Sequence, residues 1–231
     1  EHHTCRTYRR SYLLSLELIM NKETQYIKSE WFNRFPLGQE TPGTRHWLDD
    51  AERKLGGDEK LVTYNFNEWR YRGSIEPGQH VAGSFGCSHA MGYGVNTPYA
   101  EIINFANCGI SGLSNDAITR MAYTYCEQFN PRTICVLWTV PVRREYVRND
   151  GLLVKIRMDD DCFVQQQNDK WDEYNLTKNK LFLKHYCESQ KIQLLDYDFF
   201  DNDKQARDGM HPGPEWHLNM AAKILEDLNG T

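Results

Sequence analysis

HVAGSFGCSH, residues 80–89, is the segment at which the character of the chain changes. The preceding residues 31–78 are rich in proline, glycine, aromatic and charged side chains and show little periodicity. After this segment, short apolar runs bounded by glycine, asparagine or proline alternate with stretches of helical periodicity. This alternation predicts an α/β fold whose central parallel sheet is covered by helices on both faces.

Outward from this segment, four buried strands and four helices, one of them short, are predicted. The strands are expected at Val81–Phe85, Ile102–Ala106, Ile134–Val140 and Ile192–Tyr197. One helix is expected over Leu176–Gln190, and upstream of the sheet we expect an irregular wrap with a short helix over His46–Leu55. Two further helices are marked by apolar residues at i, i+3, i+4 and i+7. These residues are Ile118, Met121, Ala122 and Tyr125, and then Leu218, Ala221, Ala222 and Leu225.

The composition suits one domain with an appendage. The 231 residues carry 32 acidic and 27 basic side chains, a net charge of -5. A chain of this length buries roughly 70 to 75% of its unfolded surface without help from disulfides or metals. Residues 1–20 look like upstream or added sequence, residues 21–78 like an extension packed on the core, and residues 79–231 like the main domain.

The same composition excludes several classes of partner. Mild acidity without a Lys/Arg tract argues against nucleic acid, and no apolar run approaches the roughly 20 residues that span a bilayer. The seven cysteines form an odd set without a C-x-x-C pair, and we expect them to be reduced and mostly buried. Residues 9–20 only faintly resemble a secretory leader, because Glu17 interrupts the apolar part. These features favour a cytoplasmic protein with a small-molecule partner.

Three loops that follow predicted strands should meet, because the ligand site of a parallel sheet lies beyond the carboxyl ends of its strands. They read Gly-Cys-Ser-His at 86–89, Asn-Cys-Gly-Ile-Ser-Gly at 107–112 and Asp-Gly-Met-His-Pro at 208–212. Together they supply a hydroxyl, a glycine-rich backbone and an Asp/His pair.

This set suits nucleophilic catalysis by a serine. Ser88 needs a base within hydrogen-bond reach, His211 can be that base, and Asp208 can fix the tautomer of His211 and stabilise its imidazolium. The backbone N–H groups of Ser88 and Gly112 are candidate donors to the oxyanion of an acyl-transfer reaction. Taken singly, the same residues have simpler roles, with Ser88 as a helix cap, Asp208 as the start of a turn and Gly112 as a turn glycine.

The three loops resemble the sequence blocks of the SGNH hydrolases, the GDSL lipase/esterase-like superfamily, over roughly two thirds of the chain. The resemblance implies a three-layer α/β/α, flavodoxin-like fold that needs no cofactor. It implies that Ser88 is the nucleophile, His211 the base, Asp208 its partner and Gly112 an oxyanion donor. The lead-in NFNEWRYRG at Asn65–Gly73 also resembles uncharacterised members, which are often phage or bacterial proteins.

The chain departs from this pattern at two positions. Cys87 replaces the first-block Asp, which mainly supports the loop. After the third strand, where the family has an Asn that donates to the oxyanion, this chain has Thr139 and then Arg143 and Arg144. Losing one oxyanion donor typically lowers turnover by about 10²- to 10³-fold. We expect Thr139 or an arginine to replace the Asn or bind the substrate, unless both arginines are solvated loop charges.

Residues 141–174 form a long insertion, which predicts a lid or binding element. A hairpin of residues 152–157 with residues 162–166 is expected within it. The aromatic and arginine side chains of the insertion suit either stacking on sugars or packing of the lid onto the core.

Other candidate residues lie near the predicted nucleophile. His89 follows Ser88 and can line the pocket. Cys87 is an alternative nucleophile, although a cysteine at a strand end usually packs inward. A metal held by His211, His217 and Asp208 is a further alternative, but no ligand spacing such as H-E-x-x-H is present, so no metal is predicted.

From these residues the sequence predicts a serine esterase that hydrolyses a small acyl ester, with an O-acetyl group on a carbohydrate as the expected substrate. Two alternatives stay open. One is a binding or structural module on the same fold, for example a virion component, in which catalysis has been lost with the missing Asn. The other is an acyltransferase, which would use Ser88 and His211 but pass the acyl group to a sugar hydroxyl.

Overall fold

The centre of the molecule is a four-stranded parallel sheet. The computed structural model describes residues 35–36, 38, 40, 42–47, 62–147, 153–155, 169–199, 206 and 211–230. Within them, the sheet consists of β3 (Gly83–Gly86), β4 (Ala106–Asn107), β5 (Thr133–Trp138) and β8 (Gln193–Asp198). The strands lie in the order β4-β3-β5-β8, so the first of them in sequence lies between the second and the third. Over these four strands, this is the order of the flavodoxin-like folds.

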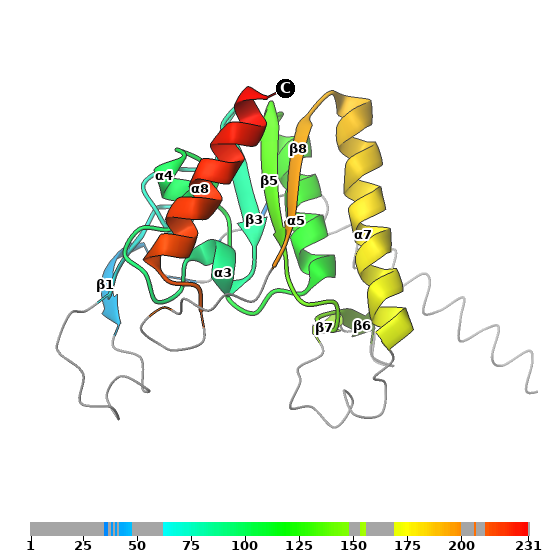
Figure 1. The fold of residues 1–231 in the computed structure, drawn as a ribbon, viewed down its shortest axis with the longest axis horizontal. Coiled ribbons are helices and arrows are strands. Elements are labelled where there is room, and N and C mark those ends of the chain that lie inside the picture. The colour runs from blue at the N-terminus through cyan, green and yellow to red at the C-terminus, as the bar shows by residue number, and fades with distance from the viewer. Residues whose placement is uncertain are drawn as a thin grey trace, which may run out of the picture.

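Helices cover both faces of this sheet (Figure 1). α5 (Asn115–Phe129) and α7 (Asp169–Gln190) lie on one face, and α4 (Tyr99–Ile102) and α8 (Pro214–Asn229) lie on the other. Successive side chains of a strand point to opposite faces, so a strand that is apolar throughout must be covered twice. In β5, alternate side chains accordingly belong to two separate core clusters. The predicted α/β fold with helices on both faces is confirmed.

α5 forms where the apolar spacing predicts it. Ser114 is its N-cap residue and accepts a hydrogen bond from the N–H of Ala117 at 3.1 Å. The helix ends at Asn130, whose φ of 46° is left-handed. The predicted face of residues 118–125 is buried against the sheet.

α8 also forms where predicted, but it buries a different face. Leu218 and Leu225, which the apolar spacing directs to the core, are 57% and 42% exposed. The residues that are buried have the same i, i+3, i+4, i+7 spacing but begin one position earlier, at His217. These residues are His217, Met220, Ala221 and Ile224. A search for apolar residues misses this face, because histidine is not counted as apolar.

The second predicted strand, Ile102–Ala106, is wrong in its bounds. Tyr99–Ile102 forms α4, Asn104 turns the chain with a left-handed φ of 58°, and only Ala106 and Asn107 form β4. Ile103 and Phe105 are buried in the cluster shared with α8, and Ile102 packs against it. A short apolar run is buried in either case, so its periodicity does not separate helix from strand.

Two small antiparallel sheets also differ from the predictions. β1 (Gly43–Trp47) pairs with β2 (Val62–Phe66), so residues 46–47 lie in a strand and not in the predicted helix, whose other residues lie outside the described ranges. β6 (Glu145–Val147) pairs with β7 (Leu153–Lys155), whereas the predicted partner, residues 162–166, lies outside the described ranges.

Two sequence-based expectations concern the chain as a whole. Cys87, Cys108, Cys126, Cys135 and Cys187, the cysteines in the described ranges, are all free and buried, as predicted. None of the described helices combines the length and the apolar character needed to cross a membrane. The division into residues 1–20, 21–78 and 79–231 stays a prediction, although Phe35 and Tyr71 do belong to the main core cluster.

Candidate active site

Ser88 is the first residue of a short helix, α3 (Ser88–Met91), at the carboxyl end of β3. Gly86 permits this sharp turn, because a Cβ there would lie 2.6 Å from the Cβ of Ala90 and 2.8 Å from the carbonyl oxygen of Leu137. The N-cap residue is Cys87, and no side chain caps the helix. The simpler role of Ser88 as a helix cap is therefore not what the structure has.

The structure brings Ser88 and His211 together across 123 positions of sequence. The Oγ of Ser88 lies 2.9 Å from Nε2 of His211, within hydrogen-bond distance. The ring of Tyr93 lies beside the imidazole of His211, with centroids 4.9 Å apart. A serine hydroxyl and an imidazole nitrogen at this distance can act as nucleophile and general base. Asp208 lies outside the described residues, so its contact with His211 stays a prediction.

On one side of Ser88 lies the loop of residues 107–114, which we call the β4-side loop. It continues the parallel pairing past β4, since the N–H of Ile110 donates to the carbonyl of Gly86 at 3.1 Å. Asn107 is buried and holds the loop, with Oδ1 accepting from the N–H of Gly109 at 3.1 Å and Nδ2 donating to the carbonyl of Met91 at 3.3 Å. Gly112 has a left-handed φ of 70°, so it does turn the chain here, while its role as an oxyanion donor stays a prediction.

On the other side of Ser88 lie residues 139–145, which we call the β5-side segment. The backbone of Thr139 is held by the buried side chain of Asn115. Oδ1 of Asn115 accepts from the N–H of Thr139 at 3.0 Å, and its Nδ2 donates to the carbonyls of Thr139 and Val140, both at 3.2 Å. The backbone uses both hydrogens of this amide, so Asn115 does not stand in for the missing oxyanion donor. Sequence reasoning missed Asn115, because an Asn inside a helical pattern gives no signal.

The two arginines of the β5-side segment have different surroundings. Nε of Arg144 lies 2.6 Å from Oδ1 of Asp172 on α7, and both side chains are buried. Nη1 of Arg143 is buried without a hydrogen-bond partner in the described part of the chain. Arg143 therefore keeps a donor for a ligand, whereas one donor of Arg144 is taken by Asp172. That either arginine, or Thr139, binds substrate stays a prediction.

Cys87 and His89 form a buried pair next to Ser88. Sγ of Cys87 lies 3.0 Å from Nδ1 of His89. Burial by itself raises the pKa of the Cys87 thiol, but the hydrogen bond and charge of His89, with a hydrogen bond from Thr139, outweigh it and lower the pKa to about 6. The ring of His89 packs on Phe199, with centroids 3.9 Å apart. The sequence pointed to each residue singly and missed the pair.

Arg72 is another residue whose role the sequence did not reveal, since it was noted only as part of the Asn65–Gly73 stretch. Its guanidinium is buried over the ring of Tyr64 at 4.4 Å and donates to the carbonyls of Met91, Gly92, Val95 and Asn96. Burial lowers the pKa of Arg72 to about 10. These bonds fix the turn after α3, which carries Tyr93 to the ring of His211.

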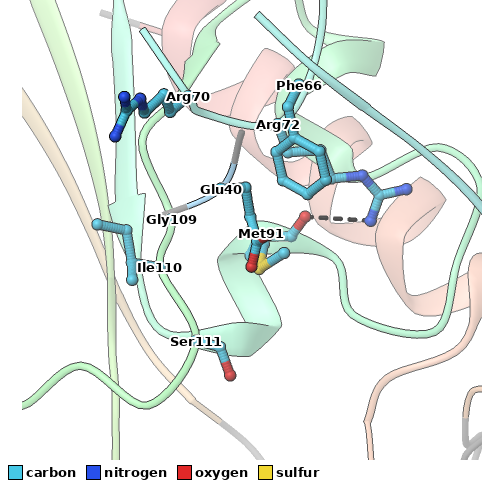
Figure 2. A pocket seen from close by; sticks show the side chains of 8 residues that line it. All are labelled: Glu40, Phe66, Arg70, Arg72, Met91, Gly109, Ile110 and Ser111. Carbon is cyan, nitrogen blue, oxygen red and sulfur yellow. Dashed lines mark hydrogen bonds between the residues drawn. The ribbon is translucent and has the colours of Figure 1, made fainter. Parts of the chain in front are cut away.

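A hollow lies between the end of α3 and the β4-side loop (Figure 2). Figure 2 shows the hydrogen bond from Arg72 to the carbonyl of Met91 at its border. Open space therefore reaches the loop that leads to Gly112. The hollow is lined by Glu40, Phe66, Arg70, Arg72, Met91, Gly109, Ile110 and Ser111.

His217, the second histidine considered as a metal ligand, belongs to the packing of α8. Its Nδ1 accepts from the N–H of Tyr99 at 3.2 Å, and its Nε2 is buried without a partner in the described part of the chain. Burial, with the charges of Arg72 and His89, lowers the pKa of His217 to about 3. Among the described residues, His, Cys, Asp and Glu side chains do not gather in groups of three or more that could hold a metal.

Comparison with known proteins adds little to this geometry. No protein-family model and no curated protein matches the chain. Among solved structures, the chain is similar to a protein described as a "putative acylhydrolase" from Bacteroides fragilis NCTC 9343, at 16% sequence identity. The match covers 68% of this chain and 91% of the other, with a TM-score of 0.37. A similarity at this level assigns no family.

Proposed function

We propose that this chain is a serine esterase of the SGNH type that hydrolyses small acyl esters. The observation that carries the proposal is the 2.9 Å contact between Oγ of Ser88 and Nε2 of His211 at the carboxyl end of β3. Ser88 is only 4% exposed, so its hydroxyl is largely withdrawn from water and bonded to a base from a distant loop. Such a pair activates a hydroxyl that is otherwise a poor nucleophile at neutral pH.

In the acylation step, Oγ of Ser88 attacks the carbonyl carbon of the ester while Nε2 of His211 takes its proton. The electron pair of the C=O bond moves onto the oxygen, where the N–H groups of Ser88 and Gly112 stabilise it. When the intermediate collapses, the alcohol leaves with the proton from His211. In deacylation, His211 takes a proton from water as the water oxygen attacks the acyl carbon. The bond between that carbon and Oγ of Ser88 then breaks, His211 returns the proton to Oγ, and the acid is released. Asp208 is assigned the role of orienting His211 throughout.

An O-acetyl group on a carbohydrate is the substrate we propose within this class. Trp171 and Tyr174 are 53% and 60% exposed on α7, and their rings are stacked with centroids 5.4 Å apart. The start of α7 lies at the same end of the sheet as α3 (Figure 1). Exposed aromatic faces with polar tips suit contact with sugar rings.

Labelling with a fluorophosphonate probe, followed by turnover of p-nitrophenyl acetate, tests the proposal. We expect the wild type to be labelled at Ser88 and to turn over the ester. Ser88→Ala and His211→Ala should stay folded but lose both the labelling and the turnover. The matched controls are Ser189→Ala and His185→Ala on α7, which lie in the exposed part of that helix and should behave as wild type. A folded wild type that is neither labelled nor active would instead favour the binding module.

A further inference from the structure

The two ring nitrogens of His89 have different surroundings. Nδ1 contacts Sγ of Cys87 at 3.0 Å. Nε2 has no hydrogen-bond partner in the described part of the chain, and it is not among the polar atoms buried without one. The ring contacts those of Phe199 and His211, with ring centroids 3.9 and 5.2 Å away. Nε2 is therefore the ring nitrogen that a ligand beside His211 can reach.

The contact with Cys87 couples the position of the ring hydrogen of His89 to the thiol. When the thiol donates to Nδ1, the neutral ring has its hydrogen on Nε2. When the proton has passed from the thiol to Nδ1, an imidazolium faces a thiolate, and the ring again has a hydrogen on Nε2. In the remaining arrangement, Nδ1–H donates to the sulfur of a thiol whose own hydrogen points elsewhere, and Nε2 is bare, so the proposal requires one of the first two.

The pair lies on the side of Ser88 that lacks the family's Asn. Thr139, the residue after β5, helps to lower the pKa of the Cys87 thiol, and the ring of His89 packs on Phe199, the residue after β8. In the strand order β4-β3-β5-β8, both strands lie across β3 from the β4-side loop.

Two backbone N–H groups of the β5-side segment are already occupied. The N–H of Thr139 donates to Asn115, and the N–H of Arg143 donates to the carbonyl of Val140. A side chain can supply the donor on this side instead, as the Asn does in the family.

We infer that His89 is a catalytic residue of the proposed esterase, whose Nε2–H donates to the oxyanion, and that Cys87 is the positioning residue that keeps the hydrogen on Nε2. The inference rests on the proposed function. As Oγ of Ser88 bonds to the carbonyl carbon, the C=O electron pair moves to the oxygen and the serine proton passes to Nε2 of His211. His89 donates a hydrogen bond to that oxygen and keeps its proton. The ring centroids of His89 and His211 are 5.2 Å apart. When His89 is an imidazolium, the thiolate of Cys87 neutralises its charge, so His211 can also become an imidazolium without facing an unbalanced positive charge.

Steady-state kinetics with p-nitrophenyl acetate on four variants test this assignment. We expect His89→Phe, which keeps a ring on Phe199 but removes the donor, to lower kcat about 10²-fold or more with KM changed only a few-fold. His89→Gln keeps an N–H donor and should retain more activity. Cys87→Ser can still donate to Nδ1 and should stay closer to wild type than Cys87→Ala. His185→Phe on α7 is the control for loss of a histidine. If Cys87 and His89 had only a structural role, the variants would differ in thermal stability, and their kcat values would not follow the order given above.

The outcomes separate this inference from the proposed function. A His89→Phe protein that is labelled at Ser88 by a fluorophosphonate and has the wild-type kcat would overturn the inference alone. A wild type that is neither labelled nor active would overturn both. Should the His89 variants not fold, nitrogen-15 NMR of the wild-type ring decides. A hydrogen on Nε2 near neutral pH is the expected result, and a neutral ring protonated only on Nδ1 overturns the assignment.

Discussion

The β4-side loop keeps its shape through contacts within its own neighbourhood, whereas the β5-side segment is held by side chains from other helices. Asn107 bonds to Gly109, two residues away in the same loop, and to the carbonyl of Met91 at the end of α3. Thr139, by contrast, is held by Asn115 at the start of α5, and Arg144 by Asp172 on α7. The side chain that holds the first loop lies in that loop's own sequence block, whereas those that hold the second lie in helices elsewhere in the sequence.

The same contrast extends to the proposed chemistry. On the β4 side, the proposed oxyanion donor is a backbone N–H, that of Gly112. On the β5 side, the proposed donor is a side chain, that of His89, which follows Ser88 in α3. The predictions that follow probe how far the two sides differ in stability and function.

Asn115→Ala is expected to have the largest effect on stability. It leaves the buried N–H and carbonyl of Thr139 without a partner, while the carbonyl of Val140 keeps its bond from the N–H of Arg143. Each orphaned group costs about 1 to 3 kcal/mol, so the free energy of unfolding should fall by about 2 to 6 kcal/mol. Asn107→Ala is the matched comparison, since it orphans only the N–H of Gly109, the carbonyl of Met91 keeping its bond from Arg72, and should cost about 1 to 3 kcal/mol. Urea denaturation measures both, and equal losses would contradict the proposed asymmetry.

Arg144→Met should destabilise the protein without affecting turnover. It leaves the carboxylate of Asp172 buried without its cation, which costs about 3 kcal/mol. Arg143→Met should have the opposite profile, with a small change in stability and a larger change in kinetics, because its Nη1 has no protein partner in the described part of the chain. Thermal unfolding and p-nitrophenyl acetate kinetics distinguish the two. If Arg144→Met lost more turnover than Arg143→Met, the division between them would be reversed.

His217→Asn should change stability only in acid. The pKa of His217 is lowered to about 3 in the folded protein, by burial and then by the charges of Arg72 and His89. Between about pH 6.5 and 3, the unfolded chain therefore binds a proton here that the folded chain does not, so stability falls as the pH falls, by at most about 1.4 kcal/mol per pH unit.

The Asn variant should lose this part of the acid sensitivity and change little at pH 7, since its side-chain oxygen can still accept from Tyr99. The hydroxyl of Tyr99 accepts a hydrogen bond from Ser84 in β3. The measurement therefore tests how much the contact between His217 on α8 and Tyr99 on α4 stabilises this strand. Thermal unfolding from pH 4 to 8 tests the prediction. Parallel curves for the variant and wild type would show that His217 is not responsible.

The sequence by itself determined the α/β class, the approximate places of β3, β5, β8, α5, α7 and α8, and the loops that carry Ser88 and His211. These features follow from apolar periodicity and from the need for glycine at a sharp turn, which are properties of neighbouring residues. Only the tertiary structure decided which face α8 buries, that residues 46–47 pair with β2, that Asn115 holds Thr139, and that the ring of His89 turns Nδ1 to Cys87. These depend on which surfaces meet and which polar groups must be paired once buried, and no local pattern records them.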